Sequence, residues 1–223
     1  LIITERYRVW TNPARRRGIW VIISSMSASL FKTLLRVLPP PSFLTMPGIG
    51  LDISDHAVRY LELIARRDGA ITLGRFGTEP FDNGVIEQGE IRDRGAVVSI
   101  LKKIKAREAV DYVHASLPDE KAYLFQTSAP RAPSEAGFRS ALEFRLEENI
   151  PLSPRDAIFD YNVVGSDGED LAVSAIAIPK AVGQEYFEVL REAGIVPLSF
   201  EIEAEAIGRA VLSHCARETG LIV

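Results

Sequence analysis

An aspartate near the end of a short apolar run is the first feature of this sequence that could do chemistry. The run covers residues 49–53 and contains Asp52, and the polar stretch Ser54-Asp55-His56 separates it from a second apolar run that starts at Val58. A carboxylate in this position can hold a magnesium ion through water molecules, and the amides of the following turn can surround phosphate oxygens. The pattern indicates a phosphate-binding loop, while a plain turn between two strands remains the alternative.

Other reactive arrangements are missing from the sequence. The three histidines, His56, His114 and His214, lie far apart, and no His or Cys has the spacing of a structural zinc site. There is no Gly-x-Ser-x-Gly elbow and no Walker loop. Gly48 and Gly50 are not followed by the third glycine of a dinucleotide-binding motif, and they precede their strand, where that motif would follow it.

The distribution of charge restricts the partners. The net charge is −4, but residues 1–45 carry seven basic residues against Glu5, a net charge of +6 that leaves −10 for the remainder. Phosphate-backbone affinity comes from clustered Lys and Arg, so the acidic remainder argues against nucleic-acid binding. The lone Cys215 allows no intramolecular disulfide, which favours the cytoplasm as the location.

The basic leader, residues 1–45, contains one amphipathic segment. In residues 30–38 the apolar side chains fall at helical spacing and Lys32 and Arg36 lie opposite them, so we expect a short helix that ends at Pro39. It could contact an anionic membrane or a partner, or pack on its own domain. The apolar run at residues 18–23 is shorter than the ~20 residues that a membrane span needs; we expect an irregular leader, with a signal sequence as the alternative.

Hydropathy and turn residues predict an α/β order after the leader. We expect strands at residues 49–53, 58–64, 71–76, 112–117, 122–127, 157–164, 171–178 and 198–202, and helices at 95–107, 134–149, 180–193 and 204–219. Residues 220–223 begin what reads as a further strand. Residues 122–178 form a strand, helix, strand, strand unit, with Ser134 as the helix N-cap and residues 165–168 as the hairpin loop.

Several stretches, in order and spacing, share their pattern with one family. Residues 50–63 combine Asp52, an aliphatic residue, a polar turn and Arg59. The others are residues 84–93, 143–152, 159–161, 175–180, 193–197 and 201–206. Together these residues resemble the type IV pilus assembly protein PilM family and its cell-division relative FtsA, over about residues 46–223.

The resemblance implies an α/β, actin-like ATPase (ribonuclease H-like) fold, first half only, with an inserted strand-helix-strand-strand subdomain. It divides the body into a first actin-like subdomain at residues 46–118, the inserted subdomain at 119–178, and a return to the first subdomain at 179–223. In the family a second phosphate loop and an adenosine pocket follow, so we expect the nucleotide site to be incomplete in this chain.

The resemblance also implies ATP and magnesium as cofactors. It assigns cofactor binding to the positions of the first loop, with Asp52 also as the metal ligand: Gly50, Asp52, Ser54, Asp55, His56 and Arg59. Several of these depart from the family pattern. Ser54 replaces a glycine, and Asp55 introduces a carboxylate where phosphate would approach, which costs electrostatic free energy unless a cation lies between them. We therefore expect weak ATP binding and slow or no hydrolysis. In actin-fold ATPases the segment around Glu201 and Glu203 approaches the catalytic water; a solvated face is the alternative.

The function implied by the resemblance is that of a cytoplasmic scaffold peripheral to the inner membrane, which binds the cytoplasmic peptide of a PilN-like protein. By analogy the peptide groove would lie between residues 49–64 and the helix 134–149. Phe144, Leu152 and Tyr161 are candidate wall residues, with burial in the core as the alternative. An actin-fold ATPase, a sugar kinase fragment and an FtsA-like cell-division protein remain alternative functions.

Overall fold

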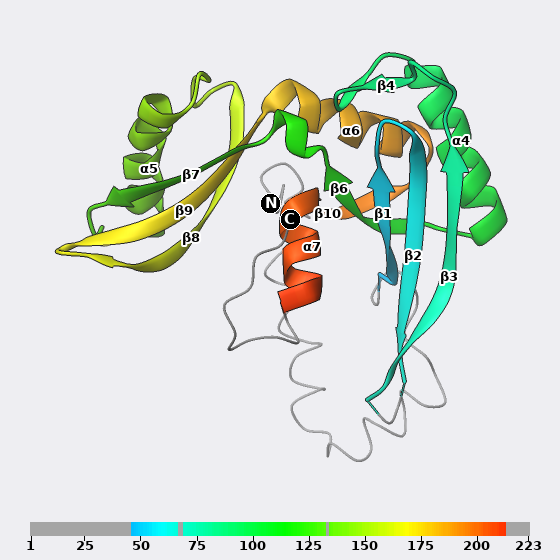
Figure 1. The fold of residues 1–223 in the computed structure, drawn as a ribbon, viewed down its shortest axis with the longest axis horizontal. Coiled ribbons are helices and arrows are strands. Elements are labelled where there is room, and N and C mark those ends of the chain that lie inside the picture. Colours follow the sequence, from blue (N-terminus) through cyan, green and yellow to red (C-terminus); the bar gives the residue numbers. More distant parts are fainter. Residues whose placement is uncertain (1–45, 67–68, 133, 213–223) are drawn as a thin grey trace, which may run out of the picture. The chain divides into compact units, whose positions relative to one another are not determined.

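Strands and helices alternate along the described part of the chain. The computed structural model describes residues 46–66, 69–132 and 134–212. In chain order, its elements are β1 (Gly48–Ile53), β2 (Ala57–Ala65), β3 (Ile71–Pro80), β4 (Ile86–Glu87), β5 (Glu90–Ile91), α4 (Arg94–Glu108), β6 (Tyr112–Leu117), η1 (Asp119–Lys121), β7 (Tyr123–Ala129), α5 (Glu135–Asn149), β8 (Ala157–Asp167), β9 (Asp170–Pro179), α6 (Lys180–Glu192), β10 (Val196–Ile202) and α7 (Glu203–Leu212) (Figure 1).

These elements confirm each strand and helix expected between residues 49 and 202. The helix expected from residue 204 is α7, described as far as Leu212. The β8–β9 hairpin is longer than expected, because β8 continues through the glycine and serine at 165 and 166 that were expected to form its loop. The expected helix at residues 30–38 and the strand at 220–223 lie outside the described residues.

The main sheet has five strands in the order β10-β6-β1-β2-β3. Strands β10, β6 and β1 are parallel, whereas β1, β2 and β3 are joined as antiparallel hairpins. In the register of β1 and β6, Leu51 lies opposite Ala115. The next residues along, Asp52 and Ser116, therefore meet at the carboxyl ends of two parallel strands, where α/β sheets commonly bind ligands.

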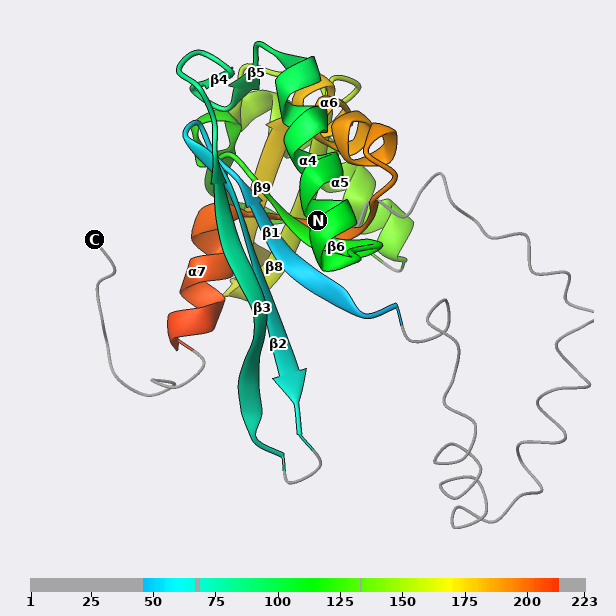
Figure 2. The same ribbon diagram turned by 90° about the vertical axis from the view of Figure 1, so that its right-hand side faces the viewer.

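Helices α4 and α6 pack against the main sheet and close its core. The buried residues of α4 include Val97, Leu101 and Ile104, spaced by four and three positions, which is the periodicity of one helix face. They share a hydrophobic cluster with β1, β6, β10 and α6. The Asp93 carboxylate accepts a hydrogen bond from the Ala96 amide and caps the N-terminus of α4. Figure 2 shows α4 and α6 beside each other.

A second sheet, β7-β9-β8, is antiparallel and carries its own helix, α5. Ser134 caps α5 by accepting a hydrogen bond from the Gly137 amide, as expected. The buried face of α5 consists of Phe138, Leu142 and Leu146, which share a second hydrophobic cluster with all three strands. The division of residues 46–223 into subdomains at 118 and 178 stays a prediction.

Two of the three candidate wall residues are partly buried, and one is exposed. Leu152 and Tyr161 pack against the second cluster. The Phe144 side chain is 74% exposed, so burial in the core, the alternative considered for this residue, is wrong. The reason is helical phase: Phe144 follows the buried Leu142 by two positions, which turns it to the opposite side of α5.

The edge strand β3 is tied to α4 by charged groups. Among the described residues, Glu79 is the one buried charged side chain, with 8% exposure. Its carboxylate accepts a hydrogen bond from Lys103 Nζ at 2.7 Å and another from Arg107, both on α4. These interactions hold the pKa of the Glu79 carboxyl below its usual range, first through the Lys103 hydrogen bond and then through that of Arg107.

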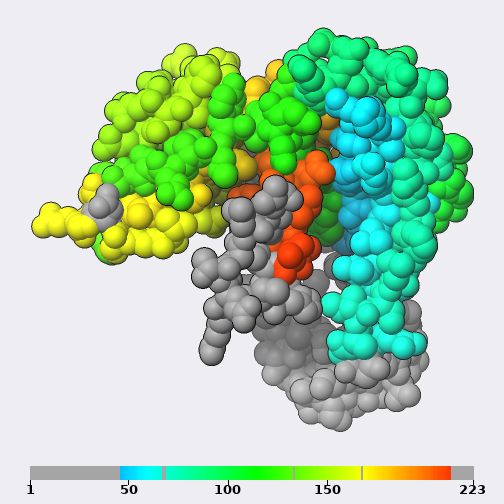
Figure 3. Space-filling model, in the orientation of Figure 1, coloured from blue at the N-terminus to red at the C-terminus, as the bar shows by residue number. Residues whose placement is uncertain are grey.

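The outer halves of β2 and β3 expose apolar side chains. Six large ones have exposed surface: Leu61, Leu63, Ile64, Ile71, Leu73 and Phe76. Figure 3 shows β1, β2 and β3, in blue and cyan, as a continuous strip of surface.

No helix of the described residues is both long and apolar enough to span a bilayer.

Candidate phosphate-loop site

Asp52 stands at the end of β1 with both carboxylate oxygens engaged. Its Oδ1 accepts a hydrogen bond from the Ser116 hydroxyl at 2.6 Å, and its Oδ2 lies 3.2 Å from Nη1 of Arg59. The parallel pairing of β1 with β6 supplies Ser116, and the β1–β2 hairpin supplies Arg59, whose backbone is opposite Asp52. The carboxylate therefore already has a cation and a hydroxyl donor.

Arg59 also contacts the turn that follows Asp52. Its Nη1 donates to the Ser54 hydroxyl oxygen at 3.0 Å, and that hydroxyl in turn donates to the Ala57 carbonyl at 3.2 Å. The Ser54 amide donates to the same carbonyl at 3.1 Å, which closes the turn. Arg59 thus links the strand end to the turn, as a basic residue at this position would in a phosphate loop, but here its partners are side chains of the protein.

Asp55 points to a different part of the chain. Its Oδ2 accepts a hydrogen bond from the Gln88 amide at 2.7 Å, and its Oδ1 accepts one from the Gly89 amide at 3.0 Å. Gln88 and Gly89 are the two residues of the turn between β4 and β5. The carboxylate is therefore held by the backbone, and His56, which follows it, is exposed.

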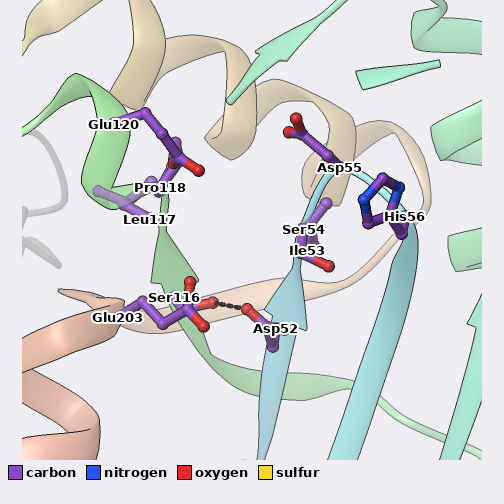
Figure 4. Close-up of a pocket in the computed structure, with 10 residues that line it drawn as sticks. All are labelled: Asp52, Ile53, Ser54, Asp55, His56, Ser116, Leu117, Pro118, Glu120 and Glu203. Atoms are coloured by element: carbon purple, nitrogen blue, oxygen red, sulfur yellow. Dashed lines mark hydrogen bonds between the residues drawn. The ribbon is translucent and has the colours of Figure 1, made fainter. Parts of the chain in front are cut away.

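A cavity of about 200 Å³ opens over this turn. Its lining combines the β1–β2 turn, the end of β6 with the residues after it, and the start of α7 (Figure 4). The lining residues are Asp52, Ile53, Ser54, Asp55, His56, Ser116, Leu117, Pro118, Glu120 and Glu203. Four of the ten are acidic and none is Lys or Arg.

The charge of this cavity changes the pKa of Glu203. Burial raises the pKa of the Glu203 carboxyl, and the neighbouring carboxylates of Asp52, Asp119 and Glu120 raise it further. Asp119 has a tertiary partner, because its Oδ1 accepts a hydrogen bond from the Ala204 amide at the start of α7, at 3.1 Å. The cavity is therefore a region of negative potential that favours protonation of the Glu203 carboxyl.

The lining of the cavity disfavours a triphosphate and its magnesium ion. A phosphate group in the cavity would meet the carboxylates of Asp55, Glu120 and Glu203 without a lining cation to offset the repulsion. Asp52 already pairs with Arg59. No group of three or more acidic, His or Cys side chains in the described residues could hold a metal ion.

The structure gathers most, but not all, of the residues predicted for this site. Asp52, Ser54, Asp55 and His56 line the cavity, and Arg59 contacts two of them. Gly50 lies two residues before Asp52 on β1 and is not part of the lining. Whether these residues bind a cofactor stays a prediction.

Two polar lining residues, Ser116 and Glu120, were not predicted from the sequence. Ser116 lies one residue before the end of β6, whose parallel pairing with β1 was not predicted, and carboxyl ends of parallel strands meet at one edge. Glu120 lies in the short helix η1, which begins after the buried Pro118. The hydropathy pattern does not reveal this helix.

A comparison with known protein families identifies the family of this chain. The family model described as type IV pilus assembly protein PilM matches residues 50–218. The chain belongs to this PilM family. The match runs through all three sheets of the described residues, from within β1 to beyond α7. No curated protein sequence matches the chain.

A solved structure shows the same fold. The chain is similar to a protein in the PilM-PilN type IV pilus biogenesis complex, with a TM-score of 0.68 and 21% sequence identity, over 77% of this chain and 52% of that one. It therefore spans about half the length of that protein. A second structure, the cytoplasmic domain of EpsL, an inner membrane component of the type II secretion system of Vibrio cholerae, has a TM-score of 0.44 and 11% identity, over 68% of this chain and 56% of that chain. A TM-score of that size does not establish a shared fold.

Proposed function

We propose that this chain acts as a scaffold in type IV pilus assembly by binding the cytoplasmic peptide of a PilN-like inner-membrane protein. One observation carries the proposal: the chain belongs to the PilM family, and its fold matches that of a protein solved in a PilM-PilN complex. The protein would then work in the cytoplasm, at the inner face of the inner membrane. Binding a short peptide requires no complete nucleotide site, so the proposal does not depend on the cavity at Asp52.

Phe144 is the residue that we propose for peptide contact. It lies on α5 with 74% of its surface exposed, and aromatic residues are enriched in protein interfaces. Val164 on β8 offers a matched control, since it is also apolar and is 60% exposed, on a strand instead of the helix. Truncation of either side chain leaves the cluster under α5 intact, because neither residue belongs to it.

The test is a titration of the full chain into a fluorescently labelled peptide with the cytoplasmic N-terminal sequence of the same organism's PilN-like protein. We expect saturable binding in fluorescence anisotropy, weakened about tenfold by Phe144→Ala, the loss of one interface anchor. Val164→Ala should bind like the wild type. Absence of saturable binding at any accessible peptide concentration would refute the scaffold proposal, and equal affinities of the two variants would exclude Phe144 as the contact.

We further propose that ATP binds this chain weakly and is hydrolysed slowly or not at all. The supporting feature is the acidic lining of the cavity, which repels phosphate. The measurement is phosphate release from ATP with and without magnesium. Rapid magnesium-dependent turnover that Asp52→Ala abolishes would overturn this part of the proposal.

A further inference from the structure

The turn between β4 and β5 leaves two amides free of the strand ladder. Glu87 and Glu90 are paired, so Gln88 and Gly89 form a two-residue hairpin turn. Their φ angles are 50° and 72°, and positive φ at both central positions is the signature of a type I′ turn. The amides of these central residues point away from the hairpin and need partners elsewhere.

Both amides find the same partner, the Asp55 carboxylate. Each carboxylate oxygen accepts one amide, from Gln88 at 2.7 Å and from Gly89 at 3.0 Å. More than thirty positions of sequence separate Asp55 from this turn, so the contact is tertiary and not a local cap. Two adjacent amides that converge on two oxygens of one anion are the arrangement by which backbone turns bind phosphate and carboxylate groups.

The amide pair is held in place by its surroundings. Gly89 is buried, and a Cβ atom on it would lie 2.6 Å from Cβ of Pro118. The Tyr186 hydroxyl, on α6, donates a hydrogen bond to the Gly89 carbonyl at 3.2 Å. The Pro118 contact and the hydrogen bond to the following peptide unit both fix the position of Gly89, which restricts the direction of the amide on its N-terminal side.

A cation also lies near the turn. Lys121 Nζ is 2.6 Å from Oε1 of Glu90, and its Cγ is 3.5 Å from the position that a Cβ of Gly89 would take. The turn therefore carries an ion pair beside its two amides. An external anion at the turn would meet donors and a nearby ammonium group.

We propose that the Gln88–Gly89 amide pair is an oxyanion-binding site that this chain closes with its own Asp55 carboxylate. The internal carboxylate competes with any free oxyanion at an effective concentration set by the fold, so external phosphate does not reach the amides. The same contact holds the Ser54 to His56 turn against β4 and β5. Removal of the Asp55 carboxylate opens the pair to inorganic phosphate.

The experiment follows the backbone amide signals of the full-length, ¹⁵N-labelled chain by NMR during titration with inorganic phosphate at constant ionic strength. In Asp55→Ala we expect the Gln88 and Gly89 signals to shift saturably, with a dissociation constant of the order of millimolar, the strength of two hydrogen bonds to a charged acceptor. Wild type should show no such shift. Glu87→Gln is the matched control, because it removes one negative charge beside the same turn and leaves Asp55 in place.

A second measurement needs no variant. In the wild type, hydrogen exchange at Gln88 and Gly89 should be about tenfold or more slower than at the β8–β9 turn residues Gly168 and Glu169, because the Asp55 hydrogen bonds must open first. Asp55→Ser should lose most of this protection and serves as the variant if Asp55→Ala does not fold. The proposal is overturned by equal exchange at the two turns, by a wild type that titrates like Asp55→Ala, by a variant whose amides ignore phosphate, or by Glu87→Gln titrating like Asp55→Ala.

Discussion

Replacement of Gly89 by alanine tests the packing of the β4–β5 turn against a matched site. Gly89 and Gly168 both have positive φ, 72° and 63°, and both lie in hairpin turns. An alanine in this left-handed region costs about 1 kcal/mol for backbone strain. Around Gly168 a Cβ atom would have no neighbour within 4 Å, so Gly168→Ala should cost that strain alone.

Gly89→Ala should lower the free energy of unfolding further, because its Cβ atom would collide with the ring of Pro118. Its Cβ would lie 2.6 Å and 2.7 Å from Cβ and Cγ of Pro118, and a buried pyrrolidine ring cannot rotate away as a flexible side chain could. Overpacking of this kind adds about 1–3 kcal/mol, which gives a total of about 2–4 kcal/mol. We therefore expect a difference of about 2 kcal/mol between the two alanine variants.

The assay is urea unfolding followed by far-ultraviolet circular dichroism, with the free energy of unfolding taken from the midpoint and slope of each curve. The amide signals of Gln88 and Gly89 report locally whether the contact with Asp55 persists. If Gly89→Ala is no more destabilising than Gly168→Ala, then Pro118 does not pack on this turn and the reasoning fails.

Two further predictions concern the rest of the fold. Glu79→Gln should destabilise the chain by about 2 kcal/mol, between the values for exposed and buried ion pairs, because the carboxylate is buried but Lys103 and Arg107 are largely exposed. The pKa of Glu79 is lower in the folded chain than in the unfolded one, so the extra stability of the wild type should be full above about pH 5 and should shrink as the pH falls through the folded pKa. A difference in urea midpoints that does not change with pH would contradict this prediction. Leu142→Ala should lower the free energy of unfolding by about 2–5 kcal/mol, because Leu142 is buried under α5. Phe144→Ala should lower it by less than about 0.5 kcal/mol, because Phe144 is exposed. Similar unfolding midpoints for the two variants would show that α5 is rotated.

Much of this fold was predictable because its elements have strong local signals. The spacing of Val97, Leu101 and Ile104 predicts α4, and Ser134 predicts the start of α5; the structure confirms both helices. The ordered stretches that resemble PilM also predicted the family, which the match over residues 50–218 confirms. By contrast, the length of the β8–β9 hairpin was not predictable, because Gly165 and Ser166 read as loop residues while cross-strand pairing with β9 extends the strand through them.

The candidate site divides in the same way. Sequence alone was sufficient to select Asp52 and its polar turn, since residue type and order along one hairpin are local properties. It could not say what those side chains contact. Ser116 reaches Asp52 through the pairing of parallel strands, and Asp55 reaches Gln88 and Gly89 across more than thirty residues.

The physical reason is that a hydrogen-bond partner depends on tertiary distance and direction, which the one-dimensional pattern does not contain. The carboxylate that looked misplaced in a phosphate loop proves to be the partner of two turn amides that no strand satisfies. The local sequence chose the residue, and the packing of the β4–β5 turn against Pro118 and Tyr186 gave that residue its partner.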